Sequence, residues 1–345
     1  MDREEIERVR EAHPIEEVVG RYVNLRRTGR RYSGYCPFHD DRRPSLVVFP
    51  ESARWWCFGA CNAGGDVFDF VMKAEGVSFP EAVRRLDGGR LTPRRFPPPP
   101  PIKGGEQRVL SEAHYALLDT AVEVYHAALL ANPRALAYAS SRGLEAGTVR
   151  EFRLGFAAGR LKRYLAFRGW SEELAADLGL IDPRGREWYR GRLVVPEVRG
   201  DPPRAIYLVG RTVPGVRDAF GPKYLTLAGV PKPLYGQERV QGLSDVFIVE
   251  GPVDYLLLWQ WGFPAVTPLG SRLKREHVEA LRGFRIYLVP HRDDAGRQLW
   301  RQCKAAFGDR LRTVLVPEEM KDVGDLAERA AAPARVFARL VDEAI

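Results

Sequence analysis

The 345-residue chain lacks any apolar run near the roughly 18 residues that a membrane-spanning helix requires. Its first residues, Met1-Asp-Arg-Glu-Glu, also lack the features of a signal peptide. Both absences predict a cytoplasmic protein without a membrane partner. Only four cysteines are present, too few for a disulfide scaffold in so long a chain. Three of them lie close together, which is typical of a metal site.

Acidic residues are outnumbered by basic ones. The formal net charge is +8 and the sequence pI is about 9.4, which favours an anionic partner, although an arginine-rich composition alone could produce the same values. The length exceeds that of a single typical core, so two or three domains are expected.

The clustered cysteines have the spacing of a zinc ribbon. Cys36 and His39 are separated by two residues, and Cys57 and Cys61 by three. Three thiolates and one imidazole make a closed tetrahedral site for one structural zinc ion, which would supply folding energy to a small module. The alternative is a set of buried free cysteines with a surface histidine.

Arginines and aromatic residues surround this pattern. Basic groups can follow a nucleic-acid backbone while aromatic rings stack on unpaired bases, so single-stranded DNA is a candidate ligand. A solvated arginine face over a small aromatic core explains the composition equally well. The residues concerned are Arg26, Arg27, Arg30, Arg31, Arg42, Arg43, Arg54, Tyr32, Tyr35, Trp55 and Trp56.

A proline-rich tract separates the first module from the rest. Residues 68–86 predict two helices, and residues 90–105 then include five consecutive prolines, which exclude a helix or a central strand. We interpret the tract as a stiff linker; the alternative is an SH3-type ligand.

The central region is expected to be mixed α and β. Residues 111–131, 135–141 and 161–180 have helical spacing, the last with a break at Gly169. Residues 189–196, 204–211, 223–227 and 232–236 predict strands that carry an excess of basic residues. Each basic residue alone could be a surface charge, but together they favour phosphate binding. The candidates are Arg190, Arg192, Arg211, Lys223 and Lys232.

Acidic residues follow three apolar strands in the C-terminal region. Residues 246–249, 285–289 and 312–316 predict parallel strands, whose carboxyl ends meet at one edge of a sheet. Carboxylates that converge there repel one another unless cations lie between them, and hard oxygen ligands suit Mg²⁺ or Mn²⁺. The candidate ligands are Glu250, Asp254, His291, Asp293, Asp322 and Asp325.

The order of these motifs resembles that of the DnaG-type bacterial DNA primases. The resemblance rests on Cys36-Pro-Phe-His39, on Gly64-Gly-Asp66, on Tyr138 to Leu144, which is similar to the family's Tyr-Leu-x-x-Arg-Gly-Leu, and on Glu250-Gly-x-x-Asp254, which opens a Toprim fold. It covers nearly the whole chain.

The resemblance implies a multidomain α+β and α/β protein. A CHC2 zinc ribbon would occupy residues 1–89 and a linker residues 90–106. A mixed α+β basic subdomain would occupy residues 107–240, and a Toprim subdomain with a mostly parallel sheet residues 241–345. The absence of the family's helicase-binding domain would then point to a phage, plasmid or other mobile-element form.

The implied activity is synthesis of short RNA primers on single-stranded DNA by metal-dependent nucleotidyl transfer. Nucleoside triphosphates would be substrates, and a replicative helicase could be a partner through another chain. The resemblance implies catalytic roles for Glu250, Asp254, Asp293 and Asp322.

Three positions depart from the family's pattern. The second zinc turn has one extra residue, His291 replaces the first acid of an Asp-x-Asp motif, and Gly324 replaces the second acid of Asp-Pro-Asp. His291 could ligate a transition metal and favour Mn²⁺, or it could be a structural residue in a weakened site.

Two other functions keep the same fold. A weakened site would leave an accessory factor that binds single-stranded DNA, whereas a Toprim nuclease would use the same acids to cut phosphodiesters. Trp259, Trp261 and Trp300 are interpreted as core residues rather than base-binding ones.

Overall fold

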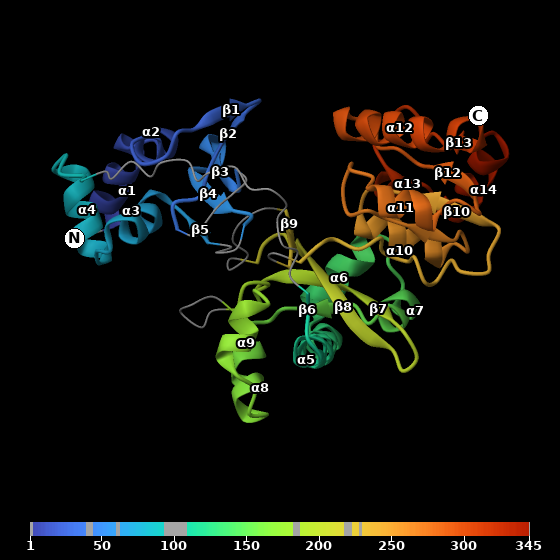
Figure 1. The fold of residues 1–345 in the computed structure, drawn as a ribbon, viewed down its shortest axis with the longest axis horizontal. Coiled ribbons are helices and arrows are strands. Elements are labelled where there is room, and N and C mark those ends of the chain that lie inside the picture. Colours follow the sequence, from blue (N-terminus) through green and yellow to red (C-terminus); the bar gives the residue numbers. More distant parts are fainter. Residues whose placement is uncertain are drawn as a thin grey trace. The chain divides into compact units, whose positions relative to one another are not determined.

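The structure is a computed structural model that describes residues 3–38, 44–59, 63–92, 109–181, 187–216, 223–227 and 230–344 (Figure 1). It divides into two compact units. Unit 1 comprises Met1–Val109, Ser171–Arg190 and Arg217–Pro231, and unit 2 comprises Leu110–Trp170, Gly191–Val216 and Lys232–Ile345. The domain boundaries proposed from the sequence stay predictions.

Unit 1 is built on an antiparallel sheet with strand order β1-β2-β3-β4-β5. The helices at Ile15–Gly20 and Val67–Glu75 pack against its strands. The strands are Arg26–Thr28, Arg31–Gly34, Leu46–Phe49, Arg54–Cys57 and Gly64–Gly65. The helices are α1 (Arg3–Ala12), α2 (Ile15–Gly20), α3 (Val67–Glu75), α4 (Phe79–Asp87) and α9 (Glu172–Asp177), with the 3-10 turn η1 (Pro50–Ser52) and the short strand β9 (Tyr224–Thr226).

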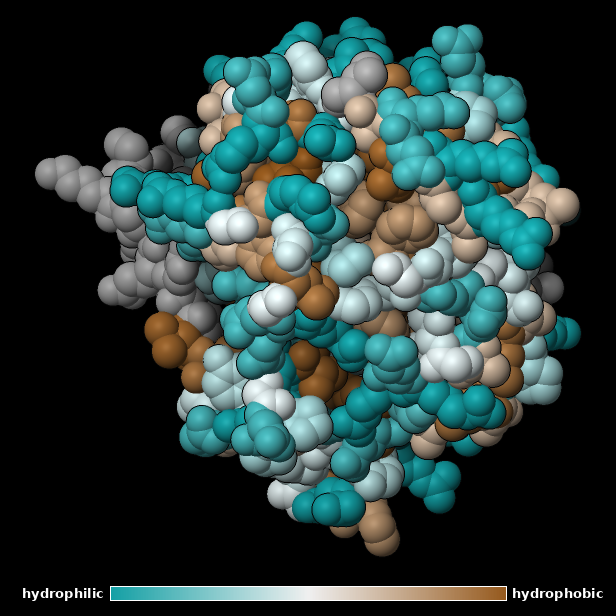
Figure 2. Space-filling view, turned by 90° about the vertical axis from the view of Figure 1, so that its right-hand side faces the viewer, coloured by the Kyte–Doolittle hydropathy of each residue, from teal (hydrophilic) through white to brown (hydrophobic). Residues whose placement is uncertain are grey.

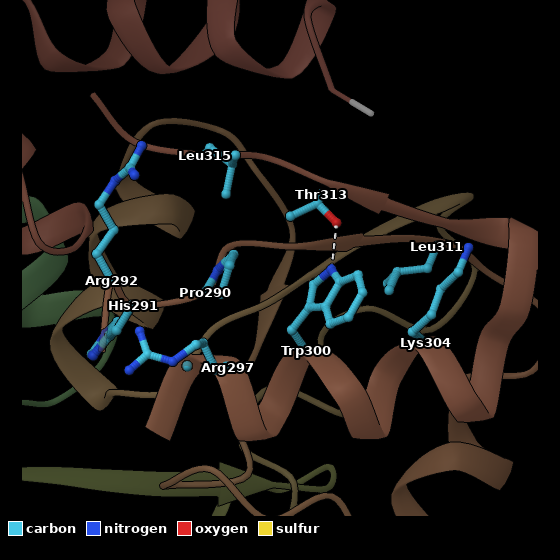
Figure 3. A pocket seen from close by; sticks show the side chains of 10 residues that line it. Pro290, His291, Arg292, Arg297, Trp300, Lys304, Leu311, Thr313 and Leu315 are labelled. Carbon is cyan, nitrogen blue, oxygen red and sulfur yellow. Dashed lines mark hydrogen bonds between the residues drawn. The ribbon is translucent and has the colours of Figure 1, made fainter. Parts of the chain in front are cut away.

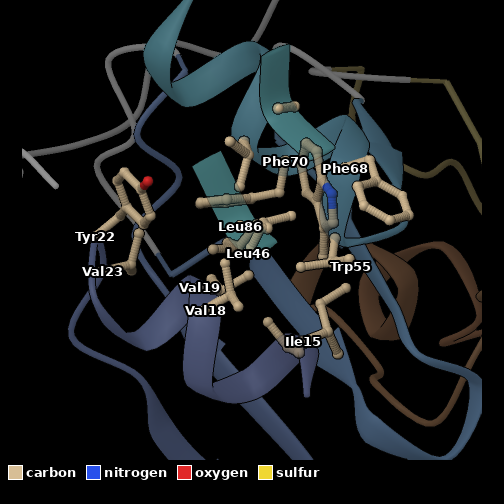
Figure 4. Close-up of a cluster of buried hydrophobic side chains, with 14 of the residues drawn as sticks. Ile15, Val18, Val19, Tyr22, Val23, Leu46, Trp55, Phe68, Phe70 and Leu86 are labelled. Atoms are coloured by element: carbon tan, nitrogen blue, oxygen red, sulfur yellow. The ribbon is translucent and has the colours of Figure 1, made fainter. Parts of the chain in front are cut away.

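The core of unit 1 combines aliphatic side chains with a cluster of aromatic rings (Figure 4). Phe70 meets Trp55 edge to face at 5.3 Å between ring centroids and Tyr22 at 5.4 Å. Phe70 is brought there by α3, which begins at a capping box: the Asp66 carboxylate accepts the amide of Asp69, whose carboxylate accepts the amide of Asp66. The two helices predicted over residues 68–86 are confirmed as α3 and α4.

The first part of unit 2 combines helices with an antiparallel sheet. Its strands β6, β7 and β8 pair in sequence order. The elements are α5 (Glu112–Leu130), α6 (Pro133–Ser141), α7 (Ala146–Glu151), β6 (Gly155–Phe156), α8 (Leu161–Phe167), β7 (Arg192–Arg199) and β8 (Arg204–Thr212).

The second part of unit 2 is an α/β fold around a parallel sheet of order β11-β10-β12-β13. Beyond their first residues, β10 and β12 are apolar and buried because both faces of a parallel sheet are covered there, whereas β13, at the edge of the sheet, exposes Arg312. The elements are β10 (Asp245–Ile248), α10 (Pro252–Gln260), β11 (Ala265–Val266), α11 (Arg275–Ala280), β12 (Arg285–Leu288), α12 (Asp294–Phe307), η2 (Gly308–Arg310), β13 (Leu311–Thr313), α13 (Val323–Arg329) and α14 (Pro333–Asp342).

Most expectations from the sequence are confirmed, including the fold class and the three parallel strands that lead into the acidic motifs. The break predicted at Gly169 within residues 161–180 is confirmed: α8 and α9 lie on either side of this glycine, whose φ is +72°. The strand predicted over residues 232–236 was wrong, because Tyr235 makes only an isolated bridge to Thr267.

None of the helices in the described part of the chain has the length and hydrophobicity needed to cross a bilayer. The face in Figure 2 is mostly hydrophilic, and its apolar residues form small separate patches.

Phe337 of α14 is one of the apolar residues that the fold buries completely. It lies 4.8 Å from Phe263 and 5.9 Å from Phe247 and Trp261 between ring centroids.

We expect Phe337→Ala to lower the free energy of unfolding by about 3–5 kcal/mol, because truncating a fully buried ring loses its burial and leaves a cavity. Chemical denaturation followed by circular dichroism measures the change. Phe167→Ala is the matched control: this ring is 84% exposed, so a change within about 0.5 kcal/mol is expected. Equal losses in both variants would contradict the packing described for α14.

Candidate functional site

Four acidic side chains lie where the parallel strands end. Glu250 follows β10, and Asp254 lies in the first turn of α10; both are buried. Asp293 and Asp322 are the N-caps of α12 and α13, and their Oδ1 atoms accept the amides of Gly296 (3.0 Å) and Asp325 (2.9 Å). Capping fixes both carboxylates while leaving the second oxygen of each for another partner.

His291 links the two buried acids. Its backbone amide donates to Glu250 Oε1 at 3.0 Å, and its Nε2 lies 2.9 Å from Asp254 Oδ2. Burial alone would lower the pKa of the ring, but the hydrogen bond to Asp254 and the surrounding carboxylate charges outweigh it and raise the pKa of His291 to about 9. At neutral pH the ring is therefore a cation among acids.

The environment of Glu250 differs from that of the other acids. Burial raises its pKa, and the charges of Asp293 and Asp254 add to the effect against the opposing influence of His291. A carboxyl group with a raised pKa binds a proton more readily than an ordinary one, which suits a group that exchanges protons during a reaction.

Two sets of side chains offer ligand atoms within 4.8 Å of one another. The first is Glu250, His291 and Asp293, and the second is Asp254, His291 and Asp322. Carboxylate oxygens with one imidazole fit a divalent cation, and the imidazole favours a transition metal. Because a ligating imidazole must be neutral, His291 would have to lose its proton before it could bind one.

Asp325 differs from the other predicted ligands, as far as the described part of the chain shows. It belongs to neither set, and its Oδ2 accepts the backbone amide of Lys321 at 3.0 Å. The carboxylate thus holds the turn before α13, and its assignment as a cation ligand stays a prediction.

Lys321 is a second cation at this edge, to which the sequence analysis gave no role. Its Nζ lies 3.1 Å from Asp293 Oδ2. Burial alone would raise the pKa of Asp293, but the Gly296 amide and the Lys321 ammonium outweigh it and hold that pKa below its usual value. The oxygen of Asp293 that could face a metal ion is thus paired with an ammonium group.

Arg142, the residue after α6, also reaches this edge and was given no role. It forms an ion pair with Glu328 of α13. A Cβ on Gly324 would lie 2.6 Å from the Arg142 guanidinium and 3.0 Å from Asp322 Oδ1. A carboxylate at position 324 would therefore need this guanidinium to move. The sequence did contain a sign of this role, because Arg142 and Gly143 belong to the Arg-Gly-Leu motif on which the resemblance rests.

Part of the candidate zinc site lies in the described residues. Cys36 and Cys57 are buried, and Cys57 Sγ accepts the Gly59 amide at 3.2 Å and lies 3.3 Å from Ser45 Oγ. An amide directed at a sulfur is a contact that stabilises a thiolate, so the environment of Cys57 fits a metal ligand. His39 and Cys61 lie outside the described residues.

Two of the predicted phosphate-binding arginines are buried within unit 2. Arg192 on β7 is 0% exposed, and Arg211 on β8 is 8% exposed, with its Nε donating to Tyr138 Oη at 2.6 Å. A phosphate could reach Arg192 only if the groups that cover it moved, and both assignments stay predictions.

The other three basic candidates are more accessible. Lys232 is exposed as a residue, but its ammonium group is partly desolvated where it donates to the Leu269 carbonyl at 3.0 Å, and this desolvation, followed by the charge of Lys274, lowers its pKa. Arg190 and Lys223 are exposed and belong to unit 1. Their roles in binding nucleic acid or triphosphate stay predictions as well.

Comparisons with known proteins match two separate regions of the chain to protein families. The family model for the CHC2 zinc finger matches residues 1–89, and the Toprim-like model matches residues 247–327. A DNA primase of Pseudomonas putida is 32% identical over 338 residues, covering 88% of this chain and 49% of that protein. A DNA primase of Listeria monocytogenes is 30% identical over 306 residues, covering 81% and 47%. The chain spans about half the length of these curated relatives.

Solved structures extend the likeness to the fold. The zinc-binding and RNA polymerase domains of the Aquifex aeolicus primase match 99% of this chain and 85% of that one, with a TM-score of 0.58 and 26% identity. A primase domain from Pseudomonas aeruginosa matches 67% of this chain and 78% of that one, with a TM-score of 0.55 and 26% identity.

We expect Lys321→Met to bind Mn²⁺ about two- to fivefold more tightly, because the ammonium competes with a cation for Asp293. The effect is limited because Lys321 is half exposed, and an exposed pair contributes about 0.2–1 kcal/mol. Calorimetric titration with Mn²⁺ measures the change. Lys304→Met is the matched control, since Lys304 makes a similar exposed pair with Asp309 at 3.3 Å. Weaker or unchanged binding in Lys321→Met would contradict the competition.

Proposed function

We infer that this chain, a relative of the DnaG-type DNA primases by its zinc finger, its Toprim-like domain and its fold, synthesises short RNA primers on single-stranded DNA. The observation that supports this most directly is the convergence of Glu250, Asp254, Asp293 and Asp322 at one edge of the parallel sheet. The relatives named DNA primase supply the reaction class.

In the proposed reaction, the 3′-hydroxyl of one nucleotide attacks the α-phosphate of another and pyrophosphate leaves. Divalent cations held at this edge would lower the pKa of the hydroxyl and neutralise charge on the phosphoryl and leaving oxygens. Asp254, Asp293 and Asp322 would hold the cations, and Glu250 would act as a ligand or as the general base. Its raised pKa supports the second role.

We propose Mn²⁺ over Mg²⁺ as the preferred ion, because His291 brings a nitrogen donor into both ligand sets. The basic residues Arg190, Arg192, Arg211, Lys223 and Lys232 would bind template and triphosphate. The zinc ribbon would sample single-stranded DNA and help to choose the start site.

A second function is favoured by a specific observation. The cationic His291 and Lys321 already neutralise part of the acidic edge. An edge whose charges are balanced internally could bind divalent cations too weakly for catalysis, which would leave an accessory factor that binds single-stranded DNA.

The deciding experiment measures de novo synthesis on unprimed single-stranded DNA with labelled nucleoside triphosphates and with Mg²⁺ or Mn²⁺ in separate reactions. We expect short products, more of them with Mn²⁺. We expect Asp293→Ala to reduce synthesis to background, because the variant loses a ligand and the α12 cap, while its affinity for single-stranded DNA stays within about twofold.

Asp294→Ala is the matched control because this neighbouring carboxylate is 97% exposed and pairs with Arg297 at the surface. It should keep full synthesis. Glu250→Gln should also lose activity. Full activity of Asp293→Ala would remove this residue from the site. Tight DNA binding without products in either metal would favour the accessory factor, and shortened strands would indicate a nuclease.

For the zinc ribbon, we expect the purified protein to contain about one zinc ion per chain and Cys57→Ser to lose most of it, because a closed site needs all four ligands. Atomic absorption measures the metal content. Cys303→Ala is the control: Cys303 is buried on α12, where burial raises its thiol pKa to about 12, so it should not bind metal. Unchanged zinc content in Cys57→Ser would contradict the proposed ligand set.

A further inference from the structure

A groove with a volume of about 500 Å³ lies between α12 and β13 (Figure 3). The volume is within the range of about 300–1,000 Å³ that is usual for small-ligand sites. Trp300 from α12 forms its base, and Leu311, Thr313 and Leu315 form the opposite wall. The groove ends at Pro290 and His291, so it opens beside the acidic edge described above.

Trp300 is held in one orientation while part of its ring stays accessible. Its indole Nε1 donates to Thr313 Oγ1 at 3.2 Å across the groove, and the residue is 41% exposed. The sequence-based interpretation of Trp300 as a core residue was therefore wrong. A large aromatic side chain that is both fixed and accessible is suited to stacking on a flat ligand.

Three basic side chains line the groove, and no acidic side chain is among its lining residues in the described part of the chain. Arg292 and Arg297 lie at the end near the acidic edge, and Lys304 lies at the opposite end. The Val316 carbonyl accepts from two atoms of Arg292, at 2.6 and 3.1 Å, which positions a guanidinium that has five donor hydrogens in total.

The pairs that Arg297 and Lys304 make do not prevent them from binding a ligand. Arg297 pairs with Asp294, and Lys304 pairs with Asp309; both acids are almost fully exposed. Exposed pairs of this kind are weak, so the phosphate of a nucleotide could compete for either cation.

We propose that this groove binds a nucleotide unit, with the base stacked on Trp300 and the phosphate on Arg297 and Arg292. A fixed aromatic face between cations combines the two features that recognise nucleotides without reading their sequence. Leu315 and Leu311, on either side of the contact between Trp300 and Thr313, would add apolar contacts beside the base. A purely apolar ligand would leave the cations unused, and a simple anion would leave the tryptophan unused.

This inference rests on the proposed function, because that reaction brings both single-stranded DNA and nucleoside triphosphates to the neighbouring edge. The nucleotide unit could belong to either. We would therefore measure binding of the full chain to fluorescein-labelled oligo(dT) by anisotropy, and to GTP and inorganic tripolyphosphate by calorimetry, without assaying synthesis.

We expect Trp300→Ala to weaken binding of oligo(dT), of GTP or of both by about fivefold or more, since removal of one stacked base contact has effects of this size. Trp300→Phe should stay within about threefold of the parent because it keeps an aromatic face. Tripolyphosphate should bind Trp300→Ala as it binds the parent, but Arg297→Gln less tightly.

Phe167→Ala removes an exposed aromatic ring on α8, outside the groove residues, and should change none of these affinities. A loss with oligo(dT) alone assigns the groove to the nucleic-acid strand, and a loss with GTP alone assigns it to the triphosphate. Unchanged affinities in Trp300→Ala overturn the proposal, as does an equal loss for tripolyphosphate, which has no base. Absence of primer synthesis in the parent would instead overturn the proposed function.

Discussion

Repulsion between carboxylates is the constraint on which the C-terminal part of unit 2 depends. Two like unit charges 4 Å apart repel by about 4 kcal/mol at an effective dielectric constant of 20, and four acids converge at one sheet edge. His291 relieves the repulsion by contacting Glu250 through its amide and Asp254 through its ring. Lys321 does the same for Asp293. The edge therefore carries its own counter-charges.

The same acids also organise the chain locally. Asp293 and Asp322 cap the helices that follow β12 and β13, so the groups that could bind a cation also determine where α12 and α13 begin. A capping carboxylate is held by the backbone before any ligand arrives, which lowers the conformational entropy that binding must overcome. A substitution of Asp293 or Asp322 would therefore change both the start of a helix and the set of oxygens that could bind a cation.

The sequence predicted the acidic edge well because its signals are local. Apolar runs that end in acids predict parallel strands with convergent carboxylates, and β10, β12 and β13 confirm this arrangement. Arg142 was missed because its position depends on the packing of α6 against residues nearly 190 positions later in the chain. Trp300 was misjudged because a tryptophan on a helix usually packs into a core. Here it lies beside β13, the edge strand of the sheet, and remains 41% exposed.

The departures from the family's pattern are physically linked. Gly324 leaves space in which the Arg142 guanidinium lies, and His291 adds positive charge where the pattern has an acid. Each change makes the edge less negative, and Lys321 acts in the same direction. Any divalent cation must then compete with protons and ammonium or guanidinium groups that are already present. Cation affinity at this edge is therefore set as much by how readily His291 and Lys321 give up their partners as by the number of carboxylates.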